Sequence, residues 1–501
     1  MVRKALEMKV RLFHPTALAL AIVALGFALR LYRLDAQSFW YDEAMSASIA
    51  RGTVAQILRN DFYSPHPPLY FLALHFWLSI DQSDLTIRLL SAMIGVAGIA
   101  GMYCLGKTLY DGTVGVVAAT IVALVPYQVF YSQEARMYAL LFLLSTLLLS
   151  SYARMLRTDS LRWWAAYTAL AALSLHTHLF SGLLLLSLHF HFVICRTPRR
   201  KPWRRFVASD GLVILAFIPR LRLTMVQAER VTGNFWIPRP SLAQLLSAPH
   251  AFTLSQHVSD RLVPLAFAVV LFLFILTHLQ VARELAARGR DSAGLTLALI
   301  AFWSPLLLTF VLSQWHPVYL ERTLMVAVPG LYLLLSWGIA RPKERLVNLI
   351  LALMVVVFGL NGLWNWYVDP DFAKPDLRAA AQLLQEKAEQ GEPIVHTSDG
   401  AFLVFSHYAP ECRRYLLEGD PAPAVPAETY ELFGGDIIAK EEVSAPRFWL
   451  VVALDNSIEF QRGLADWFDA HYALRESYTL DGIYLRHYDS GRDGQGSAIT
   501  P

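Results

Sequence analysis

The sequence has few charged residues for its length. Only 17% of its 501 residues are Asp, Glu, Lys or Arg, whereas 55% are hydrophobic; a typical soluble domain is about 25% charged. This composition argues against a soluble multidomain enzyme and excludes a disordered or fibrous chain. The formal net charge of +3 is too close to balance to indicate a nucleic-acid partner.

Cysteine is also scarce. The three cysteines, Cys104, Cys195 and Cys412, lie far apart, and two of them fall in apolar segments. This spacing excludes a disulfide framework and a cysteine-based metal site. No internal repeat is visible, so the sequence lacks the inverted-repeat signature of many membrane transporters.

Long apolar segments are abundant. A helix needs about 20 apolar residues to cross the hydrocarbon core of a bilayer, and such segments recur from Phe13 to about Val368. The predicted spans are 14–31, 84–106, 112–130, 138–155, 162–177, 179–195, 206–221, 261–281, 295–312, 324–340 and 346–366. The segment 67–80 is apolar but short and opens with two prolines. We expect it to lie at the membrane interface, although a short span there is an alternative that would invert everything after it.

The basic residues select the topology. With the amino terminus in the cytoplasm, every lysine before Lys374 falls in an inside loop, as does the dense basic run at 196–205. This is the positive-inside rule, and it supports about eleven spans. A twelfth span at 67–80 would place the run at 196–205 outside. In the cytoplasm this run is expected to contact anionic lipid headgroups.

The composition changes after Tyr367. An amphipathic helix is predicted at Asp376–Gln390 and a shorter helix at Leu464–His471. Strands are predicted at Pro393–His396, Phe402–His407, Phe448–Ala453 and Gly482–His487. The chain is therefore expected to be a polytopic α-helical membrane protein over residues 1–366, with outer-face interfacial helices. A soluble α/β domain on the outer side follows at 367–490, and a disordered tail at 491–501.

Two adjacent acids, Asp42 and Glu43, follow the first span and three aromatic residues. Neighbouring side chains do not share a helix face, so the two carboxylates are expected to have different roles. One could reach a reacting hydroxyl while the other contacts a cation, a basic residue or a backbone donor. The alternative is a charge pair at the amino end of an interfacial helix, which the helix dipole favours.

Other polar groups fall at the same predicted outer ends of the spans, where ionisable residues are costly and therefore informative. They are His66 before the apolar segment 67–80, Arg136 and Tyr138 after the third span, His176 and His178 after the fifth, and Glu321 and Arg322 before the tenth. Each has a structural alternative, such as a lone structural histidine or an arginine paired with Glu134. Together they indicate a site for an anionic substrate carried on a lipid.

In this order the motifs resemble those of the GT-C glycosyltransferases, in particular protein mannosyltransferases, lipid A aminoarabinose transferases and related bacterial transferases. The resemblance covers about residues 14–366, and the domain after it resembles the outer domains of the same bacterial proteins more loosely. The matching stretches are Arg30–Ala44, His66–Tyr70, Arg88–Ser91, Ser132–Tyr138, His176–His178, 235–238, and Tyr319–Leu324 followed by Pro329.

The resemblance implies an inverting transfer of a sugar from a polyprenyl-phosphate carrier at the periplasmic face of a bacterial inner membrane. The acceptor would be a lipid, a glycan or a protein hydroxyl. Carried over, Asp42 is the general base on the acceptor and Glu43 its partner or orienter. Arg136 and Arg322 would stabilise the lipid phosphate, as buried cations do for developing negative charge.

The sequence leaves open whether the protein uses a metal ion. Some relatives use a divalent metal ion and others none. Glu43, His66, His176 and His178 are candidate ligands, but their spacing forms no closed set. One departure from the family is Thr323, which stands where many relatives carry tyrosine; it puts in doubt a stacking or hydrogen-bonding contact to the phosphate.

Two other functions compete with this hypothesis. A transporter or lipid flippase would also place acids and arginines among helices, but it needs polar groups reachable from both faces, whereas these cluster on one side. A membrane anchor for the outer domain would require the polar clusters to be coincidental. Neither the sugar nor the acceptor can be identified from the sequence.

Overall fold

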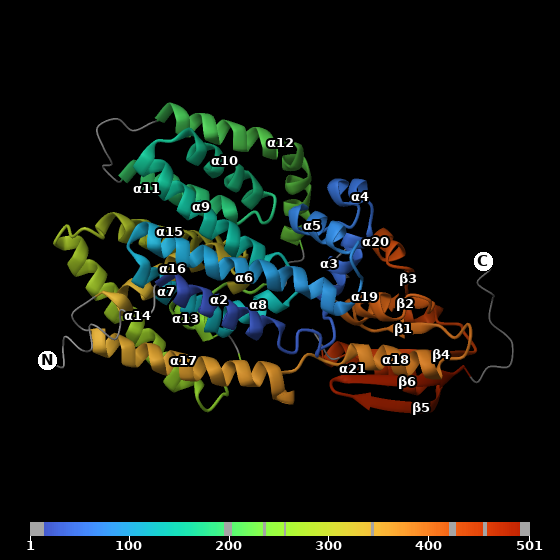
Figure 1. The fold of residues 1–501 in the computed structure, drawn as a ribbon. Coiled ribbons are helices and arrows are strands. Elements are labelled where there is room, and N and C mark those ends of the chain that lie inside the picture. The colour runs from blue at the N-terminus through green and yellow to red at the C-terminus, as the bar shows by residue number, and fades with distance from the viewer. Residues whose placement is uncertain are drawn as a thin grey trace. The chain divides into compact units, whose positions relative to one another are not determined.

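The computed structural model describes residues 15–194, 203–233, 237–254, 257–341, 345–419, 427–453 and 458–490. Among these residues, helices predominate as far as Phe372, and a mixed sheet with helices follows (Figure 1). The chain divides into two compact units. The first comprises Met1–Leu34, Pro65–Tyr70 and Arg88–Phe372, and the second comprises Asp35–Ser64, Phe71–Ile87 and Ala373–Pro501. The second unit thus includes two segments that were assigned from the sequence to the membrane part.

Each predicted span overlaps a helix, and the span predicted at 112–130 overlaps two, α7 and α8. The helices are α2 (Pro15–Leu31), α6 (Asp84–Leu109), α7 (Gly112–Leu124), α8 (Pro126–Gln133), α9 (Tyr138–Thr158), α10 (Leu161–Leu175), α11 (Ser181–Ile194), α12 (Trp203–Gly233), α13 (Leu242–Leu254), α14 (Val263–Ala286), α15 (Ser292–Leu312), α16 (Val328–Ala340) and α17 (Arg345–Val368). Short 3₁₀ turns, η2 (Glu321–Val326) and η3 (Pro370–Phe372), precede α16 and follow α17.

Within the described residues, five helices are long and apolar enough to cross a membrane: α6, α9, α14, α15 and α17. A sixth span is formed if α7 and α8, which meet at 58°, are counted as one broken helix. Shorter apolar helices are α2, α11 and α16. The chain is therefore a polytopic helical membrane protein with a carboxyl-terminal sheet domain, as predicted.

The break between α7 and α8 has an identifiable cause. Pro126 has no N–H, so it cannot donate to the carbonyl of Val122 four residues earlier. The guanidinium of Arg30, which is fully buried, takes over: Nη2 donates to Val122 O at 2.9 Å and Nη1 to Ala123 O at 3.4 Å. Its Nε also donates to Ser132 Oγ at 3.0 Å. Arg30 therefore ties α2 to both halves of the broken helix.

Two shorter helices lie near the spans. α5 (Leu69–Trp77) has nine residues and is about 14 Å long at 1.5 Å per residue, which is too short to cross a bilayer of about 30 Å. Its length fits the interfacial prediction for 67–80. α13 was not predicted, because its 13 residues fall below the length that identifies a span.

The second unit contains one six-stranded sheet of order β3-β2-β1-β4-β6-β5. β1, β2, β3 and β4 are parallel to their neighbours in that group, whereas β6 pairs antiparallel with both β4 and β5. The strands are β1 (Ile394–His396), β2 (Arg414–Leu417), β3 (Gly435–Ile438), β4 (Arg447–Ala453), β5 (Ala473–Leu480) and β6 (Ile483–Asp489). The helices are α3 (Tyr41–Arg51), α4 (Val54–Arg59), α18 (Leu377–Lys387), α19 (Asp399–Tyr408), α20 (Ala427–Leu432) and α21 (Ile458–His471), with a 3₁₀ turn η4 (Lys440–Glu442).

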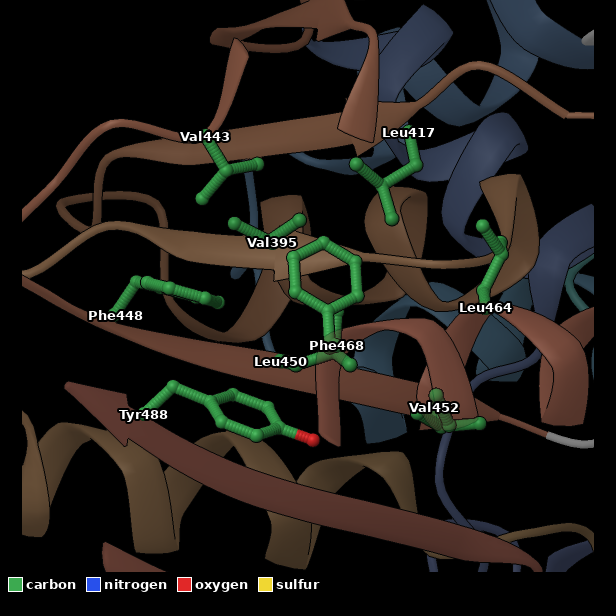
Figure 2. Packing of buried hydrophobic residues seen from close by; sticks show 10 residues of the cluster. Val395, Leu417, Val443, Phe448, Leu450, Val452, Leu464, Phe468 and Tyr488 are labelled. Atoms are coloured by element: carbon green, nitrogen blue, oxygen red, sulfur yellow. The ribbon is translucent and has the colours of Figure 1, made fainter. Parts of the chain in front are cut away.

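The core of this domain lies between the sheet and α21. Figure 2 shows Phe468 of α21 over Val395 of β1 and Leu450 of β4, with Tyr488 of β6 beside them. Burying such apolar surface contributes roughly 25 cal/mol per Å² to folding. This core makes the region a domain in its own right.

Three predicted strands, at 393–396, 448–453 and 482–487, and the helix predicted at 376–390 are confirmed within a few residues at their ends, as β1, β4, β6 and α18. The helix predicted at 464–471 is confirmed as α21, which begins six residues earlier. The strand predicted at Phe402–His407 is wrong, because these residues form α19. A short apolar run cannot be assigned to strand or helix by periodicity alone. Here the Ser398 side chain caps the helix by accepting the Ala401 N–H at 3.2 Å. Cys195, the basic residues 196–202 and the tail 491–501 lie outside the described residues.

Candidate functional site

Four of the predicted site residues come together in the first unit. His66 precedes α5, Arg136 lies in the turn between α8 and α9, His178 follows α10, and Arg322 belongs to η2. The rings of His66 and His178 are 5.3 Å apart between centroids. Both arginines are close enough to lower the pKa of each histidine. Residues more than 250 positions apart in sequence thus form one cationic cluster.

Hydrogen bonds between the motifs hold this cluster. The N–H of Leu69 donates to the carbonyl of His176 at 3.0 Å, which ties the segment after His66 to the end of α10. Tyr70 Oη and Ser91 Oγ are 2.8 Å apart, and Ser91 Oγ donates to the carbonyl of Arg136 at 3.2 Å. Four of the stretches that carry the family resemblance, 66–70, 88–91, 132–138 and 176–178, are therefore joined by hydrogen bonds.

The two histidines are neutral. Burial, followed by the charges of Arg136 and Arg322, lowers the pKa of His178 to about 3. Burial and the same two arginines also hold the pKa of His66 well below its usual range. His178 Nδ1 accepts the N–H of Phe180 at 3.2 Å, so its proton is on Nε2. That Nε2–H is buried and has no hydrogen-bond partner among the described residues, which leaves a donor available for a ligand.

The arginines sit on rigid elements. Arg136 is 3% exposed, and its own N–H donates to the Glu134 carbonyl at 2.8 Å in the turn that starts α9. Arg322 is half-buried next to Glu321, whose carbonyl accepts the Tyr127 hydroxyl at 3.0 Å. Partial burial raises the pKa of the Glu321 carboxyl. A guanidinium held in this way presents a planar set of donors suited to phosphate oxygens.

The remaining predicted residues of this unit have structural contacts. Tyr138 begins α9, is buried, and packs edge-on against Tyr131 at 5.2 Å. The Nδ1 of His176 is 2.9 Å from the carbonyl of Ala172 in the preceding turn. Thr323 is buried, and its hydroxyl donates to the Leu320 carbonyl at 2.8 Å. Thr323, which is smaller than the tyrosine of many relatives, therefore forms a hydrogen bond within the 3₁₀ turn.

One residue near the cluster was missed in the sequence. Arg220 of α12 is 5% exposed, and its Nη2 donates to the carbonyl of His66 at 3.1 Å. Its Nε and Nη1 have no hydrogen-bond partner within the described part of the chain. Buried donors are normally paired, so these two groups point to an anionic ligand. The sequence could have indicated Arg220, because this arginine lies at the predicted outer end of the seventh span.

The two acids lie in the second unit, in the first turn of α3. Asp42 is 9% exposed, and Glu43 is fully buried. Glu43 Oε2 forms an ion pair with Lys374 Nζ at 3.0 Å. The carbonyl of Asp42 accepts the Ser46 hydroxyl at 2.9 Å within the helix. Glu43 therefore faces a cation, whereas its neighbour Asp42 lies on a different side of the helix.

The described residues do not form a metal-binding site. Among the described residues, no group of three or more His, Cys, Asp or Glu side chains is placed to hold a metal ion. The donor set present in the first unit consists of two neutral histidines beside two arginines, and the positive charge of the arginines disfavours a cation there. The residues fit an anion better than a divalent metal.

A sequence model of the dolichyl-phosphate-mannose-protein mannosyltransferase family matches residues 65–221. This segment contains His66, Arg136, His178 and Arg220. A search among curated proteins found no match to the chain.

Solved structures share the fold over nearly the whole chain. ArnT from Cupriavidus metallidurans in the apo state matches with a TM-score of 0.65 at 12% identity, covering 94% of this chain and 98% of ArnT. The same protein bound to undecaprenyl phosphate gives 0.62 at 12% identity, covering 93% and 97%. The apo oligosaccharyltransferase of Archaeoglobus fulgidus gives 0.55 at 12% identity, covering 95% of this chain and 74% of that enzyme. Residues 65–221 are therefore similar to a mannosyltransferase family, and the chain shares the fold of ArnT and of the archaeal oligosaccharyltransferase.

Proposed function

We propose that this protein transfers a sugar from a polyprenyl-phosphate carrier to a hydroxyl of a cell-envelope lipid, glycan or protein, with inversion at the anomeric carbon. The observation that carries the proposal is the cluster of Arg136 and Arg322 with two neutral histidines. Guanidinium groups beside N–H donors suit the phosphate of a lipid carrier. The matching family is named for dolichyl phosphate mannose, and ArnT has been solved with undecaprenyl phosphate bound, which supports this choice of donor.

The reaction is a single displacement. The acceptor oxygen attacks the anomeric carbon and forms the new glycosidic bond as the bond from that carbon to the phosphate oxygen breaks. Asp42 takes the proton of the attacking hydroxyl, and the electron pair of the breaking bond remains on the polyprenyl phosphate. A general base of this kind contributes about 10²- to 10⁴-fold to the rate.

The arginines stabilise the leaving group. Negative charge on the phosphate grows as the bond breaks, and preorganised donors that face this charge lower the barrier. Arg136 and Arg322 provide the positive charge, and the Nε2–H of His178 provides a neutral donor. Arg220, whose Nε and Nη1 have no hydrogen-bond partner among the described residues, is a further ligand for the same anion.

The proposed setting is a bacterial inner membrane with the amino terminus in the cytoplasm. The polar residues of the cluster fall at predicted outer span ends, which supports transfer on the outer side, and the same topology predicts the α/β domain on that side. The surrounding membrane lipids supply the medium in which the carrier diffuses.

Turnover by purified protein tests the proposal. The chain in lipid nanodiscs is given radiolabelled polyprenyl-phosphate sugars and a cell-envelope extract as acceptor. We expect transfer by the wild type, a loss of at least about 100-fold in D42N, and wild-type transfer in D371N, which changes an exposed aspartate.

Three outcomes would contradict the proposal. Unchanged turnover in D42N would rule out Asp42 as the general base. Absence of transfer from every donor would rule out the proposed reaction. Movement of labelled lipid across the membrane without sugar transfer would support a flippase instead.

A further inference from the structure

The loop that leads into α3, the helix that carries Asp42, is held by the carboxyl-terminal domain within the second unit. Lys374 N–H donates to Gln37 Oε1 at 3.0 Å, and Ser38 Oγ donates to the carbonyl of Pro375 at 2.8 Å. Arg378 donates to the carbonyl of Gln37 at 3.0 Å. The segment just before and within α18 therefore satisfies the polar groups of the chain that enters α3.

A second set of contacts fixes the same loop from α19. The N–H of Phe39 donates to Tyr408 Oη at 2.9 Å, and Tyr408 Oη donates to Asp84 Oδ2 at 2.6 Å. Arg378 Nη2 also donates to Asp84 Oδ2, at 2.7 Å. Asp84 is thus a shared acceptor for α18 and α19. One carboxylate joins the two helices that hold the loop.

His407 extends this network to the end of α3. Its Nδ1 is 2.8 Å from Arg51 Nη1, and its Nε2 is 2.8 Å from Asp84 Oδ1. Arginine can only donate, so Nδ1 accepts and Nε2–H donates to the carboxylate. This is the neutral tautomer, and burial lowers the pKa of His407 in agreement with it. Both ends of α3 are therefore attached to the domain.

The ion pair between Lys374 and Glu43 lies at the start of α3. Glu43 is fully buried, and the Lys374 side chain is 13% exposed. Lys374 Nζ also lies 5.4 Å from the centroid of the Trp40 ring, which is within the range of a cation–π contact. A buried carboxylate is tolerated when it is paired. The pair therefore fixes the residue immediately after Asp42 in one orientation.

We propose that Lys374 is a positioning residue for the transfer reaction: it acts through Glu43 to hold the first turn of α3, and so orients the Asp42 carboxylate. This inference rests on the proposed function of Asp42. It makes the α/β domain an integral part of the transfer machinery rather than an appended acceptor-binding module. It also assigns Glu43 a positioning role and not that of a second reacting acid.

Steady-state kinetics of K374M, E43Q and the double variant test the coupling. A displacement of a reacting group by about 1 Å costs about 100-fold in rate, so each single variant is expected to lose roughly that factor in kcat, with the donor KM unchanged. The double variant is expected to lose no more than either single variant, since both remove one interaction. K374R, which keeps the charge, is expected to recover most of the rate. The matched control is K387M, which changes an exposed lysine at the end of α18.

Hydrogen–deuterium exchange tests the positioning without using activity. In K374M, the amides of residues 41–46 are expected to exchange faster than in the wild type, with no such change in K387M. Losses that multiply in the double variant, or exchange at 41–46 that matches the wild type, would overturn the proposal. If the wild type transfers no sugar but exchange at 41–46 rises in K374M, the proposed function fails while the structural coupling stands.

Discussion

Removing the Arg30 guanidinium is expected to destabilise the broken helix α7–α8. In R30M the carbonyls of Val122 and Ala123 lose the donors that they have in the structure. An unsatisfied buried acceptor costs about 1–3 kcal/mol, so the two together cost about 2–6 kcal/mol. Removing a buried cation relieves part of its desolvation penalty, which favours the lower end of this range. We expect R30M to be less stable than the wild type by at least about 2 kcal/mol.

A second substitution tests the cause. P126A restores an N–H that can donate to the Val122 carbonyl, and a net hydrogen bond is worth about 0.5–1.5 kcal/mol. In the R30M background P126A should therefore recover about 1 kcal/mol. In the wild-type background the recovery should be absent, because Arg30 already satisfies that carbonyl.

Unfolding in mixed micelles by titration with SDS measures these free energies, with R261M, a change of an exposed arginine, as control. Stability of R30M equal to that of R261M would refute the assignment of Arg30. Equal effects of P126A in both backgrounds would refute the link to Val122. Arg30 also donates to Ser132, which precedes Arg136 by four residues, so R30M should also weaken binding of polyprenyl phosphate.

Three further predictions concern the site and the α/β domain. R136K and R322K should each weaken binding of polyprenyl phosphate by about 10- to 100-fold, since hydrogen bonds to charged groups contribute about 1.5–3 kcal/mol; equilibrium binding measures this, and affinities equal to that of R261K would contradict it. H178Q keeps an N–H donor and should retain a donor KM near that of the wild type, whereas H178F should raise it; equal KM values in the two variants would remove the donor role of His178. Burial holds the pKa of His396 well below its usual value near 6.5, so the unfolded chain binds a proton that the folded chain excludes. Stability should fall as pH decreases below about 6.5, with up to about 1.4 kcal/mol per pH unit from this residue. H396F should reduce that slope in thermal denaturation followed from pH 7 to pH 5, and a slope identical to that of the wild type would contradict the assignment.

The membrane helices could be predicted from the sequence because the signal is local. An apolar stretch of the right length forms a helix in a bilayer regardless of its neighbours. Pro126 was within one predicted span, 112–130, and the structure shows a 58° bend there. The bend depends on a distant arginine that satisfies the freed carbonyls, and no local pattern reveals such a partner.

The convergence of His66, Arg136, His178 and Arg322 was also predictable, because the predicted topology places all four at the same side of the membrane. The contact of Arg220 with the His66 carbonyl was not, because it depends on how α12 packs. The contact of Lys374 with Glu43 could not be predicted either, because 331 positions separate the two residues. Charge alone does not select one partner over such a distance.

In the α/β domain, β1, β4 and β6 were predicted, whereas β2, β3 and β5 were missed. β5 is polar and largely exposed along its length, so it lacks the periodic pattern that identifies a strand. The residues of α19 are apolar enough for a buried strand, and only the cap at Ser398 and the packing against β1 decide for a helix. Tertiary context decided both cases.

The central claim is most directly tested by the stoichiometry and stereochemistry of transfer. The wild-type protein in nanodiscs is incubated with one synthetic polyprenyl-phosphate sugar of known anomeric configuration and a competent acceptor, and both products are quantified by mass spectrometry and NMR. One polyprenyl phosphate released for each glycosidic bond formed, with the anomeric configuration inverted, is the predicted result. Glycosidic bonds formed without release of polyprenyl phosphate, or with the configuration retained, would contradict the account.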